Sequence, residues 1–326
     1  MNILIIGLGS MGKRRIRNLQ YINKTYSIYG YDFKEERRNE AQALHSINII
    51  DDLSFAIPRM DAVIISTPPD RHVEYALMCA RYKIPFFMEA SAVTEGMEEL
   101  IKLVAQNNVL GVPSCTLVFH PAIEKISEIV SGGTLGKLCA FTHHSGQYLP
   151  DWHPWEDISQ FYVSKRETGA CREIVPFELT WLTHIFGNVL DIKGNKGHIS
   201  HINADIDDVY QCLMRFDSGL LGHLLVDVVA RDAVRSFRLI GDLGTIEWIW
   251  TEDRIKLYLA AEKQWQIIPY STLQAAEGYN PKITEEMYIK EMRAYLGAVE
   301  GKGSFPNSIE QDYRILNLLE QMEASC

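Results

Sequence analysis

Glycines near the start of the chain have the spacing of a dinucleotide-binding turn. They follow a short apolar segment, residues 2–6, and a helix-compatible segment, residues 11–21, begins at once. In such a turn one glycine allows a tight bend, the next lets the backbone approach a pyrophosphate, and the third lets helix and strand pack closely. The helix N-terminus supplies N–H groups and the positive end of a dipole. The predicted phosphate-binding residues are Gly7, Gly9, Ser10, Met11 and Gly12.

An acidic residue follows the glycines at the distance expected for a ribose ligand. The predicted second strand, residues 26–31, ends directly before Asp32, about twenty residues after Gly12. A carboxylate at this point accepts hydrogen bonds from ribose hydroxyls and repels a 2′-phosphate, so NAD is the expected cofactor. Arg37 and Arg38 lie close behind it and keep NADP as an alternative.

The first third of the chain alternates strand and helix patterns. Short apolar runs are separated by longer segments with apolar residues at helical spacing. This alternation predicts a doubly wound parallel sheet, a Rossmann domain over residues 1–118, with ligands at the carboxyl ends of its strands. The predicted strands are residues 2–6, 26–31, 47–50, 62–67, 86–88 and 110–112, and the predicted helices are residues 11–21, 34–44, 53–57, 71–82 and 96–107.

Alternation of apolar and polar residues dominates beyond residue 120, with turn signals between consecutive segments. The pattern predicts an α+β domain, residues 119–326, with one large, mostly antiparallel sheet. Its helices suffice for one face only, so we expect the open face to form a homodimer or homotetramer. The predicted strands are residues 138–147, 189–201, 208–216, 220–229, 235–240, 244–250, 255–260 and 264–268, and the predicted helices are residues 121–131, 177–186, 284–299 and 309–324.

Composition and charge narrow the range of partners. The chain has 326 residues, of which 47% are hydrophobic and 23% charged, as in globular proteins of two domains. A formal net charge of -10 argues against a nucleic-acid partner. The short basic run Lys13, Arg14 and Arg15 is expected on a solvated helix face or beside the phosphates. No apolar run has the length of a membrane span and no signal-peptide pattern is present, so we expect a cytoplasmic protein.

Cysteine and histidine spacing predicts neither a disulfide framework nor a metal centre. The six cysteines are scattered without a Cys-x-x-Cys pair, which favours free thiols in a reducing compartment. His198 and His201 have a ligand-like spacing, but no further ligands accompany them and a loop position is expected. His143 and His144 fall in a predicted strand, where neighbouring side chains point to opposite faces.

Three segments together resemble the Gfo/Idh/MocA oxidoreductases: GLGSMG, STPPDRHVEYALMCARYKIPFFMEA and VFHPAIEKISEIV. The resemblance covers nearly the whole chain and includes the large antiparallel domain. It implies an NAD(P)-dependent enzyme that acts on sugars, cyclitols or sugar nucleotides, as a dimer or tetramer. It also implies that the nicotinamide side of the cofactor is bordered by Ser66, Thr67, Pro68, His72 and Glu89, the last matching the acid of a Glu-Lys-Pro motif.

The reactive residues of that family are absent from their usual positions. Ala90 stands in place of the lysine of Glu-Lys-Pro, and Phe177 and Thr180 stand where the family often has histidine and aspartate. Thr116 and Val118 likewise replace a common asparagine and arginine. Alanine, phenylalanine and threonine are not general bases at neutral pH. Catalysis has therefore either been lost or been moved to other residues of the same site.

The stretch of residues 148–172 favours relocation, because it is dense in aromatic and charged groups that suit a sugar. Glu173 is four residues before Phe177, so a helix that continued back to it would place both on one face. Pro176 argues against this, because proline is typical of a helix's first turn, and Glu173 would then lie just outside the helix over residues 177–186. Alternative roles remain open: a solvated cation for Lys165, a turn residue for His153, and a cap or ion-pair partner for Glu173. The candidate acid–base residues are Lys165, Glu173, His153 and Tyr162, and the candidate substrate-binding residues are Tyr148, Trp152, Trp155, Arg166 and Arg172.

Three functions fit these residues. The first is an NAD(P)-dependent oxidoreductase that moves a hydride between nicotinamide and a hydroxyl or keto carbon of a sugar, aminosugar, cyclitol or nucleotide sugar. The second is a catalytically silent NAD-binding regulator, which the substitutions at Ala90, Phe177 and Thr180 would explain. The third is an epimerase or lyase that holds its NAD tightly and uses transient oxidation.

Overall fold

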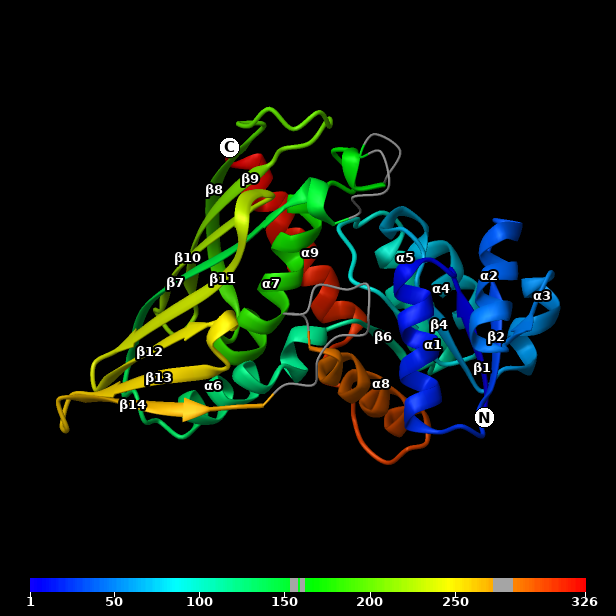
Figure 1. Ribbon diagram of the computed structural model, residues 1–326, viewed down its shortest axis with the longest axis horizontal. Helices are drawn as coiled ribbons and strands as arrows, with labels where there is room; N and C mark the ends of the chain where they lie inside the picture. Colours follow the sequence, from blue (N-terminus) through cyan, green and yellow to red (C-terminus); the bar gives the residue numbers. More distant parts are fainter. Residues whose placement is uncertain (153–157, 159–161, 272–283) are drawn as a thin grey trace. The chain divides into compact units, whose positions relative to one another are not determined.

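Two units divide the chain in the computed structural model, which describes residues 1–152, 158, 162–271 and 284–326 (Figure 1). The first unit comprises residues 1–116 and 288–314, and the second comprises residues 117–287 and 315–326. The first break lies close to the predicted domain boundary. The return of residues 288–314 to the first unit has no counterpart in the sequence pattern.

The first unit is built on a six-stranded parallel sheet with the strand order β3-β2-β1-β4-β5-β6. The order reverses beside the first strand, since both the second and the fourth strand pair with it. Such a reversal opens a crevice at the carboxyl ends of the strands, where nucleotides bind. The predicted doubly wound sheet is therefore confirmed. The strands are β1 (Asn2–Ile6), β2 (Ser27–Tyr31), β3 (Asn48–Ile49), β4 (Ala62–Ile65), β5 (Phe86–Met88) and β6 (Gly111–Pro113).

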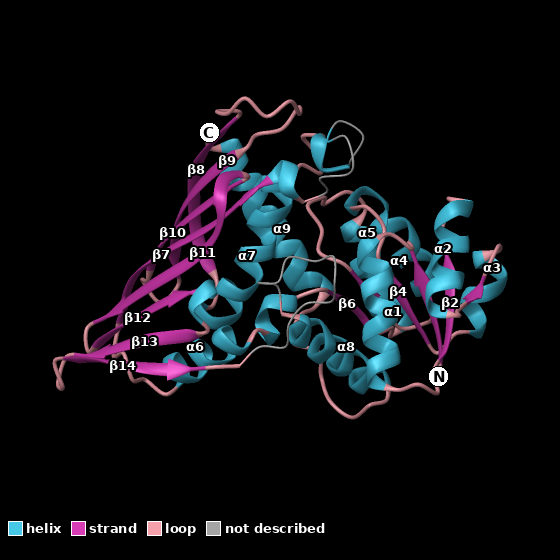
Figure 2. Cartoon of the chain, viewed as in Figure 1, coloured by secondary structure: helices cyan, strands magenta, loops and turns pink. Residues whose placement is uncertain are grey.

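Helices cover the parallel sheet. Right-handed crossovers place α1 and α2 on one face and α4 and α5 on the other (Figure 2). On the first face a late helix, α8, joins the core: Met292 and Tyr295 pack with Ile3 of β1, and the Tyr295 hydroxyl donates to the Val63 carbonyl at 3.1 Å. The helices are α1 (Ser10–Ile22), α2 (Glu35–His45), α3 (Leu53–Ala56), α4 (His72–Tyr82), α5 (Met97–Asn107) and α8 (Glu285–Val299).

The second unit contains an eight-stranded sheet with the order β14-β13-β12-β11-β7-β10-β9-β8. Its neighbours pair antiparallel except for the central pair β7 and β10, which is parallel. This confirms the large, mostly antiparallel sheet. Its strands are β7 (Leu138–Tyr148), β8 (Val189–Gly197), β9 (Val209–Phe216), β10 (Leu221–Asp227), β11 (Val229–Gly241), β12 (Gly244–Ile249), β13 (Arg254–Leu259) and β14 (Gln264–Pro269).

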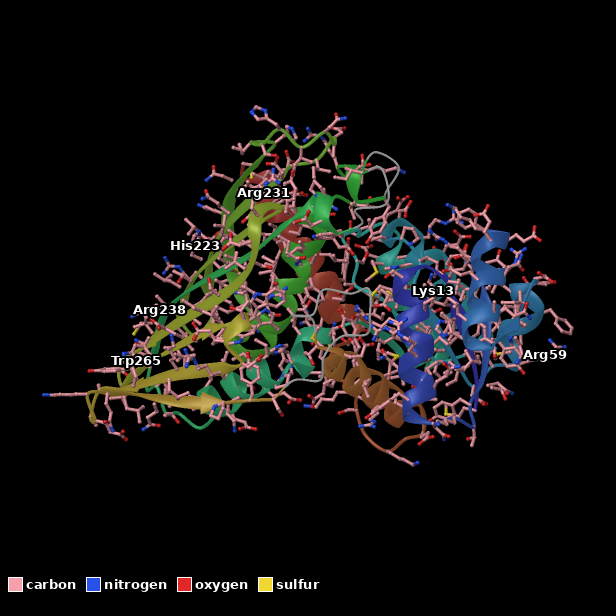
Figure 3. The ribbon with its side chains drawn as sticks, in the orientation of Figure 1. Lys13, Arg59, His223, Arg231, Arg238 and Trp265 are labelled. Carbon is pink, nitrogen blue, oxygen red and sulfur yellow. The ribbon has the colours of Figure 1, made fainter. Side chains whose placement is uncertain are left out.

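One face of this sheet carries the helices of the second unit, namely α6 (Pro121–Ser131), α7 (Ala170–Phe186) and the later part of α9 (Ile309–Ala324). Among the described residues no helix covers the opposite face, where Figure 3 shows the side chains of His223, Arg238 and Trp265. Leu213 and Leu221 on this open face are 60% and 48% exposed. Within the ranges that the structure describes, no helix is long and apolar enough to cross a membrane.

The helix before the glycine at residue 187 differs from its prediction. It begins at Ala170 rather than residue 177, so Pro176 lies inside it and Glu173 lies in its first turn. Proline removes one backbone donor from a helix interior. The first turn nevertheless forms, with the Glu173 N–H donating to the Gly169 carbonyl at 2.9 Å, because it buries Cys171 and Val175. The expectation that Glu173 lies outside the helix was wrong.

Two strands of the second unit have bounds that differ from their predictions. β8 ends at Gly197 rather than residue 201, because the Asp208 carboxylate accepts the N–H groups of Ile199 and Ser200 and turns the chain away. His198 and His201 consequently lie in a loop. β11 begins at Val229, earlier than the predicted residue 235, with an irregular register over residues 229–234.

Candidate functional site

The glycine turn between β1 and α1 has no room for side chains at two of its three glycines. A Cβ on Gly12 would lie 1.9 Å from the Gly7 carbonyl oxygen, and one on Gly7 would lie 2.5 Å from the Ser66 carbonyl oxygen. Gly7 also has φ +94°, a left-handed value that favours glycine. Gly9 differs, since a Cβ there would meet, among the described residues, only the Arg37 guanidinium, at 3.6 Å.

The open space at Gly9 is the cradle that a pyrophosphate requires. Gly9 is the N-cap of α1 and provides no side chain to cover the first helical turn. Ser10 begins the helix, and the Met11 sulfur accepts a hydrogen bond from Arg14 at 3.6 Å. The turn therefore has the shape that the sequence motif implies, and no side chain of Gly9 caps the N–H groups of the first turn of α1.

Asp32 lies at the carboxyl end of β2, beside the glycine turn. Only 3% of it is exposed, and its two carboxylate oxygens accept the N–H groups of Leu8 at 2.8 Å and Lys34 at 2.9 Å. The Arg37 guanidinium approaches one of these oxygens to 3.7 Å. Each oxygen keeps a second lone pair for a ribose hydroxyl. The basic residues nearby reduce, but do not remove, the repulsion that Asp32 would exert on a 2′-phosphate.

The segment after β4 contributes polar atoms that lack partners. The imidazole of His72 bonds the Thr67 carbonyl through Nε2 at 2.7 Å, and burial lowers the pKa of His72, so the neutral ring donates at Nε2. Its Nδ1 and the Thr67 hydroxyl are buried without a partner among the described residues. Pro68 caps the short turn that precedes α4. Unpartnered buried polar atoms are costly in a finished structure and are typical of a ligand site.

Glu89 follows β5 and is held by a buried arginine. Arg15 of α1 donates to both of its carboxylate oxygens at 2.7 Å, and the Ser66 hydroxyl donates to one of them at 3.1 Å. The Glu89 side chain keeps 12% exposure, whereas that of Arg15 is fully buried. The prediction of a solvated or phosphate-facing Arg15 was wrong. Its helix face packs against the sheet, where two carboxylates neutralise its charge.

The second carboxylate on Arg15 comes from α8 and was not anticipated from the sequence. Glu291 lies 2.8 Å from the Arg15 guanidinium and is fully buried. It also accepts the hydroxyls of Ser114 and Thr116 and the N–H of Cys115. Burial raises the pKa of Glu291, while Glu89 and Glu291 raise the pKa of Arg15 against the opposing effect of burial. The chain segment after β6 is thus tied to α1 and α8.

In the second unit a buried carboxylate lies next to the position of the missing histidine. Glu178 follows Phe177 in α7, and its oxygens accept from Arg235 at 2.8 Å, His143 at 2.8 Å and Trp181 at 2.7 Å. Burial alone would raise the pKa of Glu178, but the charges of Arg235 and His143 outweigh it and hold the pKa below its usual value. Glu178 therefore acts as a structural anion within this cluster.

Two of the four candidate acid–base residues are brought together. The Tyr162 hydroxyl donates to the carboxylate of Glu173 at 3.1 and 3.3 Å, at the N-terminal end of α7. Both side chains are partly exposed. Lys165 is exposed on the loop that precedes this helix. His153 and Trp155 lie outside the described residues.

The candidate substrate-binding residues mostly have protein partners in the second unit. Arg166 pairs with Asp205 at 2.8 Å and Asp207 at 2.9 Å, and Arg172 pairs with Glu323 at 2.9 Å. The Arg166 pairs tie the loop before α7 to the loop before β9, and the Arg172 pair ties the first turn of α7 to α9. The ring of Tyr148 lies 3.7 Å beneath the Arg231 guanidinium, and Trp152 ends a short turn after β7 with its side chain partly exposed.

Comparison with known proteins agrees with the fold and the glycine turn. Residues 1–113 match the oxidoreductase family with an NAD-binding Rossmann fold, which makes the protein an NAD-binding oxidoreductase by class. Residues 123–247 match the GFO/IDH/MocA C-terminal domain. The chain belongs to the Gfo/Idh/MocA oxidoreductase family.

Individual relatives are distant. The myo-inositol 2-dehydrogenase of Thermotoga maritima is 26% identical over 147 residues, a stretch that spans 42% of each chain. An oxidoreductase from Agrobacterium radiobacter, solved with NAD+, L-tartaric acid and magnesium, superposes with a TM-score of 0.87 at 14% identity, over 100% of this chain and 96% of that one. Levoglucosan dehydrogenase in complex with NADH gives a TM-score of 0.85 at 17% identity, with the same coverage. These two structures share the fold.

Proposed function

We propose that the protein is an NAD-dependent oxidoreductase that interconverts a hydroxyl and a keto group on a sugar, aminosugar, cyclitol or nucleotide sugar. Membership of the family and the fit of the glycine turn to a dinucleotide support the redox chemistry. The inositol and levoglucosan dehydrogenases among its relatives support a polyhydroxylated substrate. When bound, NAD supplies a nicotinamide ring that accepts a hydride from the substrate carbon.

The Tyr162–Glu173 pair is the observation that favours an active enzyme over a catalytically silent protein. A phenol alone is a poor base at neutral pH, but a phenol that donates to a carboxylate can pass its proton on as it takes another. In alcohol oxidation Tyr162 would accept the proton of the substrate hydroxyl and transfer its own to Glu173, which ends protonated. The reverse transfers would serve reduction. Residues of this kind replace what Ala90, Phe177 and Thr180 cannot supply.

A panel of sugars, cyclitols and nucleotide sugars tests this function through NADH absorbance. The variants Tyr162→Phe and Glu173→Gln should each lower kcat by about a hundredfold with little change in the affinity for NAD. Tyr258→Phe is the matched control, because Tyr258 lies on β13 in contact with Trp265. If the two variants retain wild-type kcat on an accepted substrate, the proton-transfer role is excluded.

The same panel separates the two alternative functions. A protein that binds NAD and converts no member of the panel would be the silent regulator. A protein that is isolated with bound NAD and converts substrate without net formation of NADH would be the epimerase or lyase.

We also propose that the open face of the eight-stranded sheet forms a homodimer or homotetramer. Leu213, Leu221 and Ile267 are about half exposed there, and a hollow of about 300 Å³ is lined by residues that include His144 and Arg238. A face of this composition is normally covered. Leu221→Arg should lower the mass measured by light scattering, whereas Leu44→Arg on α2, 64% exposed, should not. An unchanged mass for Leu221→Arg would count against this interface.

A further inference from the structure

Two cysteines of the second unit lie where α9 ends against the large sheet, at the end of the chain marked C in Figure 1. Cys212 is on β9 and is fully buried, with its side chain on the face of the sheet that carries the helices. Cys326 follows the end of α9 and is exposed. One thiol is therefore protected and the other is accessible.

The register of the sheet places the end of α9 beside Cys212. Cys212 is paired with Gly194 of the neighbouring strand β8. The Gly194 N–H donates to the Ser325 hydroxyl at 3.0 Å, and the Met322 sulfur lies 2.8 Å from the point that a Cβ on Gly194 would occupy. Directly opposed residues of an antiparallel pair have their Cβ positions about 5 Å apart. The last turn of α9 therefore lies over Gly194, one strand away from Cys212.

The Cys326 thiol is directed to the same place. It donates to the Met322 carbonyl oxygen at 3.3 Å, and its sulfur lies 3.9 Å from the Met322 sulfur. Met322 itself is fully buried. Burial and the nearby Cys326 thiolate raise the pKa of Cys212 to about 12. The register and the influence of one thiol on the other both place the two cysteine sulfurs in one cluster with Met322.

The other four cysteines differ from this pair. Cys79, Cys115 and Cys171 are buried, and burial raises the pKa of each, with added effects of carboxylates at the last two. Cys139 on β7 is exposed. Neither strand beside it, β10 or β11, contains a cysteine. Cys139 is therefore an accessible thiol without a cross-strand cysteine, and it makes a natural control.

We propose that Cys212 and Cys326 form a reversible disulfide that fastens the end of α9 to the sheet, with a low-molecular-weight disulfide, oxidised glutathione, as the oxidant. The Cys326 thiolate attacks one sulfur of oxidised glutathione, which releases one glutathione thiolate and leaves the other glutathione on Cys326. The Cys212 thiolate then attacks the Cys326 sulfur and releases the second glutathione. Two protein thiols are oxidised, one glutathione disulfide is reduced, and the two cysteine protons pass to the released thiolates. Reduced glutathione reverses both steps.

The end of α9 suits such a bond. Cys326 lies beyond the regular helix, and its N–H donates to the Glu323 carbonyl at 3.4 Å, so its movement toward Cys212 breaks little regular structure. The Glu323 carboxylate accepts from Arg172 and Tyr210, which keeps the last turn of α9 on the second unit. The bond would close a loop of about 115 residues, and a crosslink across a long loop stabilises the folded state. It involves neither the cofactor nor the substrate.

Mass spectrometry after treatment with oxidised glutathione tests the bond in the Cys139→Ser protein, which lacks the exposed thiol of β7. Each chain should lose two hydrogen atoms, and digestion should give one pair of peptides joined through Cys212 and Cys326. With Cys212→Ala added, Cys326 should instead keep one glutathione. With Cys326→Ser added, the protein should not react.

The rate and the stability change are further readouts. Closure requires the Cys212 thiolate, so its rate should rise about tenfold for each unit of pH between about pH 7 and pH 9. The oxidised Cys139→Ser protein should unfold about 5 °C higher than the reduced one, and dithiothreitol should abolish the difference. The Cys212→Ala protein, treated in the same way, should show no such rise.

Three results would overturn the proposal. The first is a glutathione that stays on Cys326 as long in the Cys139→Ser protein as in the protein with Cys212→Ala added. The second is a disulfide between two chains, visible as a dimer on a non-reducing gel. The third is an unreacted Cys326. If Cys212→Ala loses stability, Cys212→Ser removes the same thiol and keeps the comparison informative.

Discussion

Each unit buries an arginine among polar partners, and the two clusters differ in the number of carboxylates that face the arginine. In the first unit Arg15 lies between Glu89 and Glu291, so one cation is shared by two carboxylates. In the second unit Glu178 is shared by Arg235 and His143. Both ring nitrogens of His143 lie within hydrogen-bond distance of oxygen atoms, Nε2 at 2.8 Å from Glu178 and Nδ1 at 2.9 Å from the Ser236 carbonyl.

This difference determines which carboxylate can be substituted in each cluster without a large loss of stability. An arginine with two carboxylates keeps a counter-charge when one of them is removed. A single carboxylate that serves both Arg235 and His143 has no substitute, and its loss leaves the buried Arg235 charge without a partner among the described residues. In the first unit, the second carboxylate on Arg15 leaves Glu89 able to face a ligand while the arginine keeps a counter-charge. The second unit instead places its irreplaceable anion, Glu178, beside the partly exposed Phe177 in α7.

The largest expected effect is therefore that of Glu178→Gln, which should destabilise the second unit by about 3 kcal/mol. Tryptophan fluorescence during urea unfolding measures it, because all six tryptophans lie within residues 117–287. Glu128→Gln is the control, since Glu128 forms an exposed pair with Lys125 on α6 and should change stability by less than about 0.5 kcal/mol. A cost for Glu178→Gln no greater than that of Glu128→Gln would contradict the role of Glu178 as the counter-charge of Arg235.

These clusters also show where inference from the sequence ends. The glycine turn, Asp32 and the strand–helix alternation depend on local spacing, so they are predictable from neighbouring residues. The burial of Arg15 depends on Glu291, which lies far along the chain on a helix whose periodicity reveals its apolar face but not the sheet it covers. Pro176 indicated a helix start because local propensity favours it, but burial of Cys171 and Val175 extends the helix to Ala170.

For the segment of residues 148–172, the sequence shows which types of reactive residue are present but not which of them lie together. The density of aromatic and charged groups indicated a site, and the structure pairs Tyr162 with Glu173. It also engages Arg166 and Arg172 with acids from other loops and from α9. The sequence pattern alone does not distinguish an arginine that binds a substrate from one that pairs with a carboxylate far along the chain. Pairings of this kind depend on tertiary structure.

The next largest effect concerns a carboxyl in the first unit that has no ion-pair partner among the described residues. Asp312, in the first turn of α9, is buried with an oxygen that has no partner among the described residues, and burial raises its pKa to about 7. Its folded-state pKa is above the unfolded value of about 3.9, so the protonated form favours folding. Stability is therefore highest below about pH 4 as far as this group is concerned, and it falls as the pH rises toward 7.

Asp312→Asn should remove this dependence. The variant should exceed the wild type in stability by about 2 kcal/mol at pH 8 and by much less at pH 4, since the amide does not titrate. Circular dichroism melts across that range measure the difference, with tryptophan fluorescence identifying the contribution of the second unit. A constant difference between the two proteins at all pH values would show that Asp312 does not titrate in this window.

The smallest effect of a single substitution is expected for Glu291→Gln, which should lower the free energy of unfolding by about 1 kcal/mol. Arg15 keeps its pair with Glu89 in this variant. The new amide oxygen also still accepts one or two of the hydrogen bonds from Ser114, Cys115 and Thr116. Glu89→Gln should be similarly mild. The double variant, however, leaves Arg15 buried with no anion, and should cost about 2 kcal/mol more than the sum of the two. Hydrogen exchange in α1 and α8 measures all three. Additive costs would mean that the carboxylates do not share Arg15 as a common partner, and the contrast with Glu178 would then fail.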